Sequence, residues 1–295
     1  MPEQANKSAR RVLVTGAYGL IGNAVYERFA GEPERYDAYG LDRQEEASER
    51  LRAGRVFRIP RDRFVAANIA DAGVVCRAAG GMDAVVHLAA NPDGGGGWES
   101  VLSSNIVGVY NVLEACRRGR VKRVVLASTI QVVYGYCRNE RYCAIMERTA
   151  AALPPGVAPL GADHAPRPLS LYAASKAWTE ALAHVYAYEH GLSCLCVRIG
   201  WVPRGGGPPC AEAYPVWCSR RDIVALIERC VAAPAEVRYD IFYGVSNNAG
   251  RWVDIEHARA RVGYEPRDRS ETYQAPADRK GGGPAAEGGR SGRRE

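Results

Sequence analysis

The sequence predicts an α/β fold, with a doubly wound parallel sheet followed by a small C-terminal lobe. Short apolar runs of strand length alternate with amphipathic helical stretches, a glycine-rich turn follows the first run, and the alternation stops near Gly200. Parallel strands need long crossovers, which helices provide, and helices on both faces then bury the strands. This burial explains why the predicted strands are nearly continuous in hydrophobic residues.

The elements expected in the first two-thirds of the chain follow this alternation. Strands are expected at Arg11–Thr15, Ala38–Leu41, Phe64–Ala67, Ala84–Leu88, Val121–Ala127 and Leu192–Ile199. Helices are expected between them, at about 20–31, 71–79, 98–117 and 171–190. We therefore predict a flexible N-terminus at 1–10 and a Rossmann-type domain at 11–200.

A different pattern follows Gly200. Gly205–Pro209 indicates a loop, and Ser219 is the expected N-cap of a helix over 220–232. A strand at Arg238–Tyr243 and a helix near 253–262 complete a predicted substrate-binding lobe at 201–270. Residues 275–295 are rich in Gly, Pro and Ala, so we expect a disordered tail that cannot bury enough apolar surface to fold.

Composition and charge argue against membrane, nucleic-acid and metal partners. The longest apolar runs, such as Asp83–Ala90, are too short to cross a bilayer, and the polar N-terminus lacks the apolar core of a signal peptide. A cytoplasmic location is expected. The net charge of +6 forms no basic stripe, which disfavours nucleic-acid binding. The nine cysteines include no C-x-x-C and no zinc-ligand spacing, so we expect reduced thiols and no metal.

A glycine-rich turn directly follows the first predicted strand. It has the sequence TGAYGLIG at 15–22, and an apolar-periodic helix follows it. Glycines at such a turn let backbone N–H groups approach a pyrophosphate, and the helix N-terminus adds partial positive charge. Asp42 follows about 20 residues after the last of these glycines, where a carboxylate binds the adenosine ribose and repels a 2′-phosphate. We therefore predict an NAD site that includes Gly16, Tyr18, Gly19, Leu20, Ile21, Gly22 and Asp42.

Tyr172 and Lys176 form a second motif, one turn apart on the helix predicted at 171–190. A tyrosine phenol titrates near pH 10, and a neighbouring ammonium favours the phenolate and lowers that pKa. Lysine occurs only at Lys7, Lys122, Lys176 and Lys280, so a chance match to this spacing is improbable. We interpret the pair as a proton-transfer group and expect Lys176 to bond the nicotinamide ribose as well.

The same chemistry needs a hydroxyl that orients the reacting oxygen. Ser128 and Thr129 stand at the C-terminal end of the fifth predicted strand, the edge where open α/β sheets bind ligands. Their position alone does not choose between the two.

Together these residues resemble the extended short-chain dehydrogenase/reductase family, also called the NAD-dependent epimerase/dehydratase family. The resemblance extends from about Val12 to Asp268 and rests on TGAYGLIG, Asp42, HLAA at 87–90, NIVGVYNVLEA at 105–115, RVVLAST at 123–129, YAASK at 172–176 and VRIG at 197–200. Within the family, SRRDIVALIE, YGVSNNAGRW and VGYEPRD are similar to segments of the uronate dehydrogenase branch.

The resemblance implies further roles. It assigns the catalytic hydroxyl to Thr129 and a supporting role in the active site to Asn105. It also places Asn68 and Ile69 beside the adenine, and Leu88, Ala89 and Ala90 beneath the dinucleotide. The substrate residues expected from it are Asn91, Thr129, Gln131, Trp201 and Arg204.

The substrate side departs from the uronate dehydrogenase branch. Ile130-Gln131 stand where that branch has Asn-His, and Trp201 replaces a serine. The arginine that grips the substrate carboxylate aligns near Glu212, and Arg204 is a candidate substitute. An extra segment around Cys137–Pro155 separates Thr129 from Tyr172.

Three functions remain open at this point. We favour NAD-dependent oxidation of a secondary hydroxyl or lactol on a sugar-like or nucleoside-like small molecule. An epimerase or dehydratase that retains NAD is the second hypothesis, although the acid pair typical of dehydratases is absent after Thr129. A dinucleotide-sensing regulator is the third. In each case we expect a homodimer or larger homo-oligomer.

Overall fold

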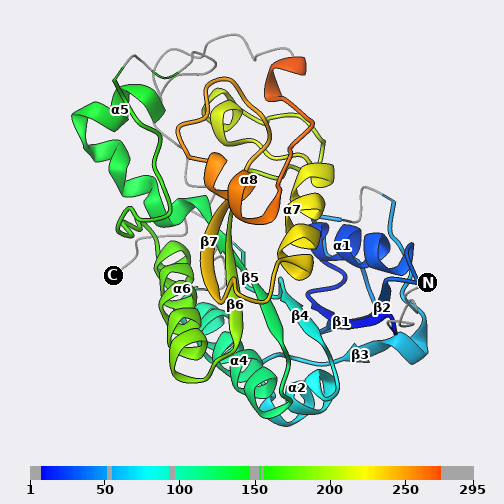
Figure 1. Ribbon diagram of the computed structural model, residues 1–295. Helices are drawn as coiled ribbons and strands as arrows, with labels where there is room; N and C mark the ends of the chain where they lie inside the picture. The colour runs from blue at the N-terminus through cyan, green and yellow to red at the C-terminus, as the bar shows by residue number, and fades with distance from the viewer. Residues whose placement is uncertain (1–7, 52–54, 93–96, 147–152, 154–155, 274–295) are drawn as a thin grey trace, which may run out of the picture.

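A computed structural model of the chain describes residues 8–51, 55–92, 97–146, 153 and 156–273 (Figure 1). The predicted flexible N-terminus up to residue 7 and the predicted tail at 275–295 lie outside these residues. Within the described part, no helix is long and apolar enough to cross a bilayer.

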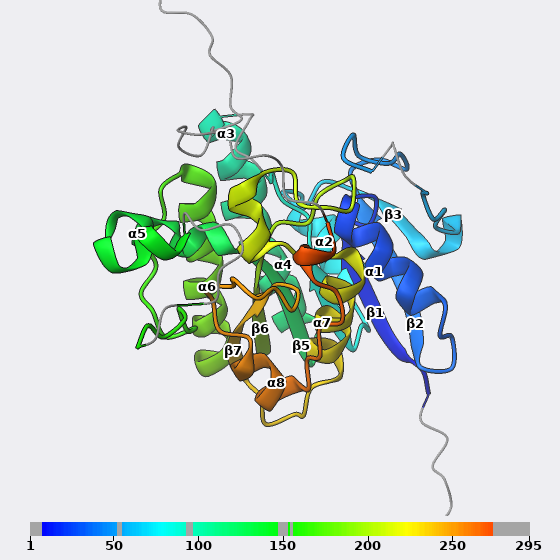
Figure 2. The same cartoon turned by 90° about the horizontal axis from the view of Figure 1, so that it is seen from above.

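The core of the molecule is one parallel sheet of seven strands, in the order β3-β2-β1-β4-β5-β6-β7. The strands are β1 (Arg10–Thr15), β2 (Tyr36–Asp42), β3 (Phe64–Ala66), β4 (Ala84–His87), β5 (Arg123–Thr129), β6 (Ser193–Ile199) and β7 (Tyr239–Gly244). The order reverses between β1 and β4, so chain crossovers leave the sheet on both faces. Figure 2 shows the strands from β3 at one side to β7 at the other. The predicted doubly wound α/β fold is confirmed.

Helices cover both faces of the sheet. One face carries α1 (Leu20–Ala30) and α7 (Arg220–Ala232), and the other carries α2 (Ala72–Ala79), α4 (Gly108–Arg118) and α6 (Leu171–Glu189). Each helix turns its apolar residues toward the strands, and these two buried clusters supply most of the hydrophobic stabilisation.

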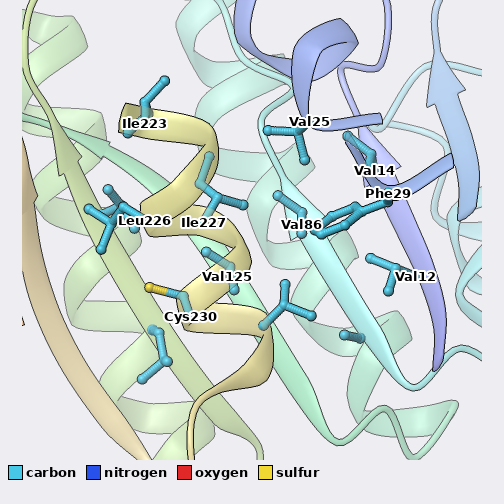
Figure 3. Close-up of a cluster of buried hydrophobic side chains, with 14 of the residues drawn as sticks. Val12, Val14, Val25, Phe29, Val86, Val125, Ile223, Leu226, Ile227 and Cys230 are labelled. Atoms are coloured by element: carbon cyan, nitrogen blue, oxygen red, sulfur yellow. The ribbon is translucent and has the colours of Figure 1, made fainter. Parts of the chain in front are cut away.

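The segment predicted as a small C-terminal lobe contributes to this same core. Its strand is β7, which pairs in parallel with β6 from Cys194 opposite Tyr239 to Ile199 opposite Gly244. Its helix α7 packs Ile223 against the cluster that contains β1 and β4 residues (Figure 3). Residues before and after position 200 therefore share one hydrophobic core. Pairing with β7 also satisfies the backbone groups of β6 that an open edge would leave unpaired.

The helix predicted at 98–117 is interrupted. It consists of α3 (Gly97–Val101), a π-helical turn (Leu102–Val107) and α4, and the Gly108 N–H bonds the carbonyl of Ser103 instead of residue 104. A Cβ on Gly108 would lie 2.6 Å from the Ile69 side chain, so a larger residue here would displace Ile69. Such π-turns are frequent at functional sites because they change where side chains point. Here the turn carries Asn105.

The extra segment after β5 is ordered at its start. A 3₁₀ helix (Ile130–Arg138) leads into α5 (Glu140–Met146), at the end of the molecule far from α1 (Figures 1 and 2). Its buried side chains pack with the end of β7 and with Val253 in a third cluster. The remaining described elements are α8 (Glu256–Val262) and short 3₁₀ helices at Arg61–Arg63, Ala211–Val216 and Ser270–Thr272.

Candidate functional site

The glycine turn forms a tight cradle between β1 and α1. Gly16 has a φ of +72°, and a Cβ there would lie 2.7 Å from the backbone nitrogen of Ala89. A Cβ on Gly22 would lie 2.0 Å from the Gly16 carbonyl oxygen. Gly19 caps α1 without a side-chain bond, so the first-turn N–H groups that follow are open to an anion. These contacts explain why glycine is required where the sequence places it.

Asp42 lies beside this cradle at the end of β2. Its Oδ2 accepts a hydrogen bond from the Tyr18 N–H at 2.8 Å, and its Oδ1 accepts one from the Arg43 N–H at 2.7 Å. Both bonds fix the carboxylate next to the glycine turn, which is the arrangement that a ribose diol requires. The structure therefore brings the predicted Asp42 and glycine residues together.

The predicted adenine residues follow β3. The Asn68 side chain accepts a hydrogen bond from the Ala70 N–H at 3.0 Å, and Ile69 is buried against α4. The amide nitrogen of Asn111, on α4, donates to the carbonyls of Ile69 and Ala70 at 3.1 and 3.0 Å. Asn111 thus holds this loop, a role that the sequence patterns did not reveal.

His87 ends β4 and joins it to β1. Its Nδ1 lies 2.8 Å from the Thr15 hydroxyl oxygen, which also accepts a 3.4 Å hydrogen bond from the Ala89 N–H. Burial, together with the charge of Lys176, lowers the pKa of His87 to about 3. His87 is therefore neutral at physiological pH. Its contact with Thr15 joins the ends of β1 and β4, directly before Leu88, Ala89 and Ala90.

Asn105 connects the loop after β4 to α6. Its side chain accepts from the Asn91 N–H at 2.8 Å and donates to the Asn91 carbonyl at 3.0 Å. It also donates to the Ser175 hydroxyl at 3.0 Å, and that hydroxyl donates to the Tyr172 carbonyl at 2.7 Å. Asn105 is 2% exposed, so this network fixes backbone positions instead of binding solvent.

Tyr172 and Lys176 lie on the first turns of α6, which Ser170 caps by accepting from the Ala173 N–H at 3.1 Å. Lys176 is 3% exposed, and its Nζ donates to the Ala127 carbonyl on β5 at 2.8 Å. The same Nζ lies 5.9 Å from the centre of the Tyr172 ring. Burial lowers the pKa of Lys176 to about 8. The ammonium is thus positioned to favour the phenolate form of Tyr172.

The two hydroxyls at the end of β5 have different surroundings. Ser128 donates to a carboxylate oxygen of Glu180 at 2.6 Å in the buried interior. Thr129 accepts from the Gln131 N–H at 3.3 Å, at the last position of β5. The Ser128 hydroxyl is therefore committed to a structural bond, which distinguishes two residues that the sequence left equivalent.

The expected substrate residues are less tightly grouped. Trp201 is 41% exposed, and its backbone bridges to Trp217. Arg204 donates through Nε to the Arg50 carbonyl at 3.1 Å, so its side chain contacts the loop after β2. Glu212 is exposed on a 3₁₀ helix, while Ile130 is 3% exposed and belongs to the third buried cluster. Ile130 therefore faces the core and not a substrate.

The donors of the site fit a dinucleotide. The glycine cradle leaves no space for a Cβ at Gly16 or Gly22, and the Asp42 carboxylate lies beside it at the end of β2. Among the described residues, no group of three or more His, Cys, Asp or Glu side chains is placed to hold a metal ion. All nine cysteines are free thiols. The fold and the site together define an NAD-dependent enzyme of the extended short-chain dehydrogenase type.

Comparison with known proteins gives the family. The chain belongs to the NAD dependent epimerase/dehydratase family, whose model matches residues 12–202. It is 32% identical to an NAD-dependent glucose-6-phosphate dehydrogenase of Haloferax volcanii, over 89% of this chain and 95% of that protein. It is also 32% identical to a uronate dehydrogenase of Pseudomonas putida, over 91% of this chain and 88% of that protein.

Solved structures agree with this assignment. A uronate dehydrogenase mutant from Agrobacterium tumefaciens complexed with NAD is 28% identical to the chain and superposes with a TM-score of 0.69. The match covers 92% of this chain and 93% of that one. The protein is therefore an enzyme of this family, and NAD is its cofactor.

The preference for NAD over NADP should depend on Asp42. Asp42→Ala removes a carboxylate that would bind the adenosine ribose, and a charged hydrogen bond of this kind corresponds to about 10- to 100-fold in affinity. We expect the dissociation constant of NAD to rise by that factor while NADP binding improves, both measured by titration of protein fluorescence. Glu45→Ala, exposed in the loop after β2, is the matched control. Equal affinity of the unmutated protein for both cofactors would contradict the assignment.

Lys176→Met should separate activity from stability. Since burial puts the pKa of Lys176 at about 8, below that of a lysine in the unfolded chain, the charged form opposes folding below pH 8. This penalty fades as the pH rises from about 8 to about 10.4, where both states become neutral. Methionine carries no such penalty, so the melting temperature at pH 7 should be maintained or raised.

We expect turnover of the Lys176→Met variant to fall on the order of 10²-fold, because a neutral side chain there would no longer favour a phenolate at Tyr172. Calorimetry and initial rates test the two effects, with Lys122→Met as the exposed control, whose side chain is 81% exposed. A variant that is both unstable and inactive would show that Lys176 acts mainly in folding.

Proposed function

We propose that the protein oxidises a secondary hydroxyl or a lactol of a sugar-like molecule, with Tyr172 as the general base. The observation that carries this proposal is the buried Lys176 ammonium, which is held by β5 at 2.8 Å and lies over the Tyr172 ring. The named relatives, a glucose-6-phosphate dehydrogenase and uronate dehydrogenases, support a sugar as the substrate. Both are dehydrogenases, which favours net oxidation over epimerisation with retained NAD.

Each residue has one role in the proposed chemistry. Thr129 would align the substrate oxygen, and Tyr172 as phenolate would take the hydroxyl proton. Lys176 would hold the phenolate form and bond the nicotinamide ribose. NAD, when bound, supplies the hydride acceptor. Asn105 would keep the Tyr172 backbone in place through Ser175, whose hydroxyl accepts from Asn105 and donates to the Tyr172 carbonyl.

The substrate pocket is proposed to suit a neutral or apolar-bearing sugar or nucleoside. Trp201 supplies an exposed aromatic surface, and Gln131 supplies a neutral polar group beside Thr129. The Arg204 side chain donates to the Arg50 carbonyl at 3.1 Å, while Glu212 is an exposed acid. A carboxylate substrate is bound best by a bidentate arginine, and neither residue offers one here.

We also expect the protein to act in the cytoplasm as a homodimer or larger homo-oligomer. Exposed aromatic and aliphatic side chains on α6, namely Trp178, Val185 and Tyr188, support association through this helix.

Tyr172→Phe tests the proposed base directly. The change removes only the phenolic oxygen, and general acid–base catalysis contributes roughly 10²–10⁴-fold to the rate. We expect NADH formation to fall by that range, with NAD affinity preserved, in a screen of aldoses, glucose 6-phosphate, uronates and nucleosides. Tyr188→Phe, on the exposed side of the same helix, should behave as the unmutated enzyme. Near-normal turnover of Tyr172→Phe would rule out the mechanism.

Simple uronates should be poor substrates. With no arginine at the aligned position, kcat/KM for galacturonate or glucuronate should be at least about 100-fold below that of the best neutral sugar, because a charged contact in a closed site is worth several kcal/mol. Steady-state kinetics with matched neutral and acidic sugars measures this ratio. Efficient uronate oxidation that Arg204→Ala abolishes would instead show that Arg204 leaves Arg50 and binds the carboxylate.

A further inference from the structure

Four polar side chains form a connected cluster in the interior beneath the reacting groups. Glu180 accepts from Arg198 through both carboxylate oxygens, at 2.9 Å to Nε and 2.9 Å to Nη2. The Glu180 oxygen that receives Nε also accepts the Ser128 hydroxyl at 2.6 Å. Arg198 Nη1 donates to the Tyr243 hydroxyl at 2.8 Å. All four residues are at most 3% exposed.

Such a cluster is an expensive way to stabilise a fold. Removing a carboxylate and a guanidinium from water costs several kcal/mol per ion, and apolar residues of similar volume are often as stable or more so. The surrounding layers are built from ordinary apolar contacts, which do not require an ion pair at this position. Stability therefore does not explain this ion pair, and its role is better inferred from the elements that it connects.

The cluster joins the elements that carry the chemistry. Ser128 directly precedes Thr129 at the end of β5, and Glu180 lies one turn after Lys176 on α6. Arg198 is on β6, opposite Ser128 in the strand register. The cluster therefore fixes the end of β5, the catalytic face of α6 and the end of β6 relative to one another, through bonds whose directions are strict.

Tyr243 extends this frame to β7 and to the segment before α6. Its hydroxyl donates to the Gly161 carbonyl at 3.3 Å while it accepts from Arg198. Gly161 belongs to the stretch that returns from the extra segment to the start of α6. The position of that stretch, and with it the N-terminus of α6, thus depends on the same cluster.

We propose that the Glu180–Arg198 pair is a positioning device for catalysis, which sets α6 against β5 so that Tyr172 and Lys176 face Thr129. The pair acts through Ser128, whose hydroxyl links β5 to Glu180 on α6 and takes no part in the reaction. This inference rests on the proposed roles of Tyr172 and Thr129.

The decisive variant replaces both charges at once, Glu180→Leu with Arg198→Met. No single charge is left buried, so the fold should persist with a melting temperature equal to or above that of the unmutated enzyme. NAD affinity should change less than turnover, because the glycine cradle and Asp42 lie on other strands and only the Lys176 contact to the nicotinamide ribose depends on α6. Turnover should fall about 10- to 100-fold, as displacement of reacting groups by about 1 Å does. Unchanged turnover in this folded variant would overturn the proposal.

Arg123→Met is the matched control. Arg123 is also buried on β5, but at the opposite end of the strand, where it donates to the carbonyls of Cys230 and Pro234 at 3.1 and 2.8 Å. Its loss should lower the melting temperature and leave turnover per folded molecule intact. The double variant should thus lose turnover and keep stability, whereas Arg123→Met should lose stability and keep turnover. A purely structural role for the Glu180–Arg198 pair would not produce this contrast.

Ser128→Ala covers the case in which the double variant fails to fold, since it removes one bond and leaves the ion pair. It should lower turnover by up to about 10-fold with NAD affinity unchanged, and Ser128→Thr should restore it. In the Glu180→Leu/Arg198→Met background, Ser128→Ala should have no further effect, because the tether has lost its partner. A full additional loss there would mean that Ser128 touches the substrate itself, and would contradict the proposal.

Rates are measured as NADH formation with the best substrate among aldoses, glucose 6-phosphate and galacturonate. Tyr172→Phe is assayed in parallel. If that variant keeps its activity, the proposed base is wrong. If it is inactive while the double variant is fully active, the base is supported and only the positioning role fails.

Discussion

The bond from the buried Lys176 ammonium to the Ala127 carbonyl places α6 on the end of β5, and the reacting side of the molecule is arranged around it. A lysine taken out of water in this way has a pKa of about 8, so its charge is costly and is kept only where it is useful. The charge lies 5.9 Å from the centre of the Tyr172 ring and also acts on the buried His87. Activation of the Tyr172 phenol, as proposed above, is a use that would account for this cost.

The rest of the site depends on how closely backbone segments approach one another at the carboxyl edge of the sheet. Gly16 touches the chain after β4, and Gly22 touches Gly16, at distances that exclude any side chain. Thr15 and His87 lock the two strand ends together beneath this contact. These contacts shape a cradle of backbone groups that suits a dinucleotide pyrophosphate.

The residues on the cofactor side and on the substrate side of the site differ in how firmly the protein holds them. The residues expected to bind the cofactor are fixed by hydrogen bonds within the protein. Asp42, for example, accepts from the N–H groups of Tyr18 and Arg43. The proposed substrate residues lie in the segments after β5 and β6, where Trp201 is exposed and Arg204 contacts the loop after β2. Since loops tolerate substitution more easily than the strands that carry them, a family can keep its hydride chemistry and change its substrate there.

Local sequence patterns were sufficient to predict the first six strands, the glycine turn and the positions of Asp42, Tyr172 and Lys176. Each of these follows from a short-range cause: strand hydrophobicity, a turn that only glycine allows, or the one-turn spacing of a helix. The sequence alone did not reveal that β7 extends the main sheet, that a π-turn carries Asn105, or that Ile130 faces the core. Position in the sequence left Ser128 and Thr129 equivalent, and only the family resemblance pointed to Thr129. These features depend on partners distant in the chain, such as Glu180 for Ser128 and Asn91 for Asn105, and only the packing of α6 and the strands brings those partners together.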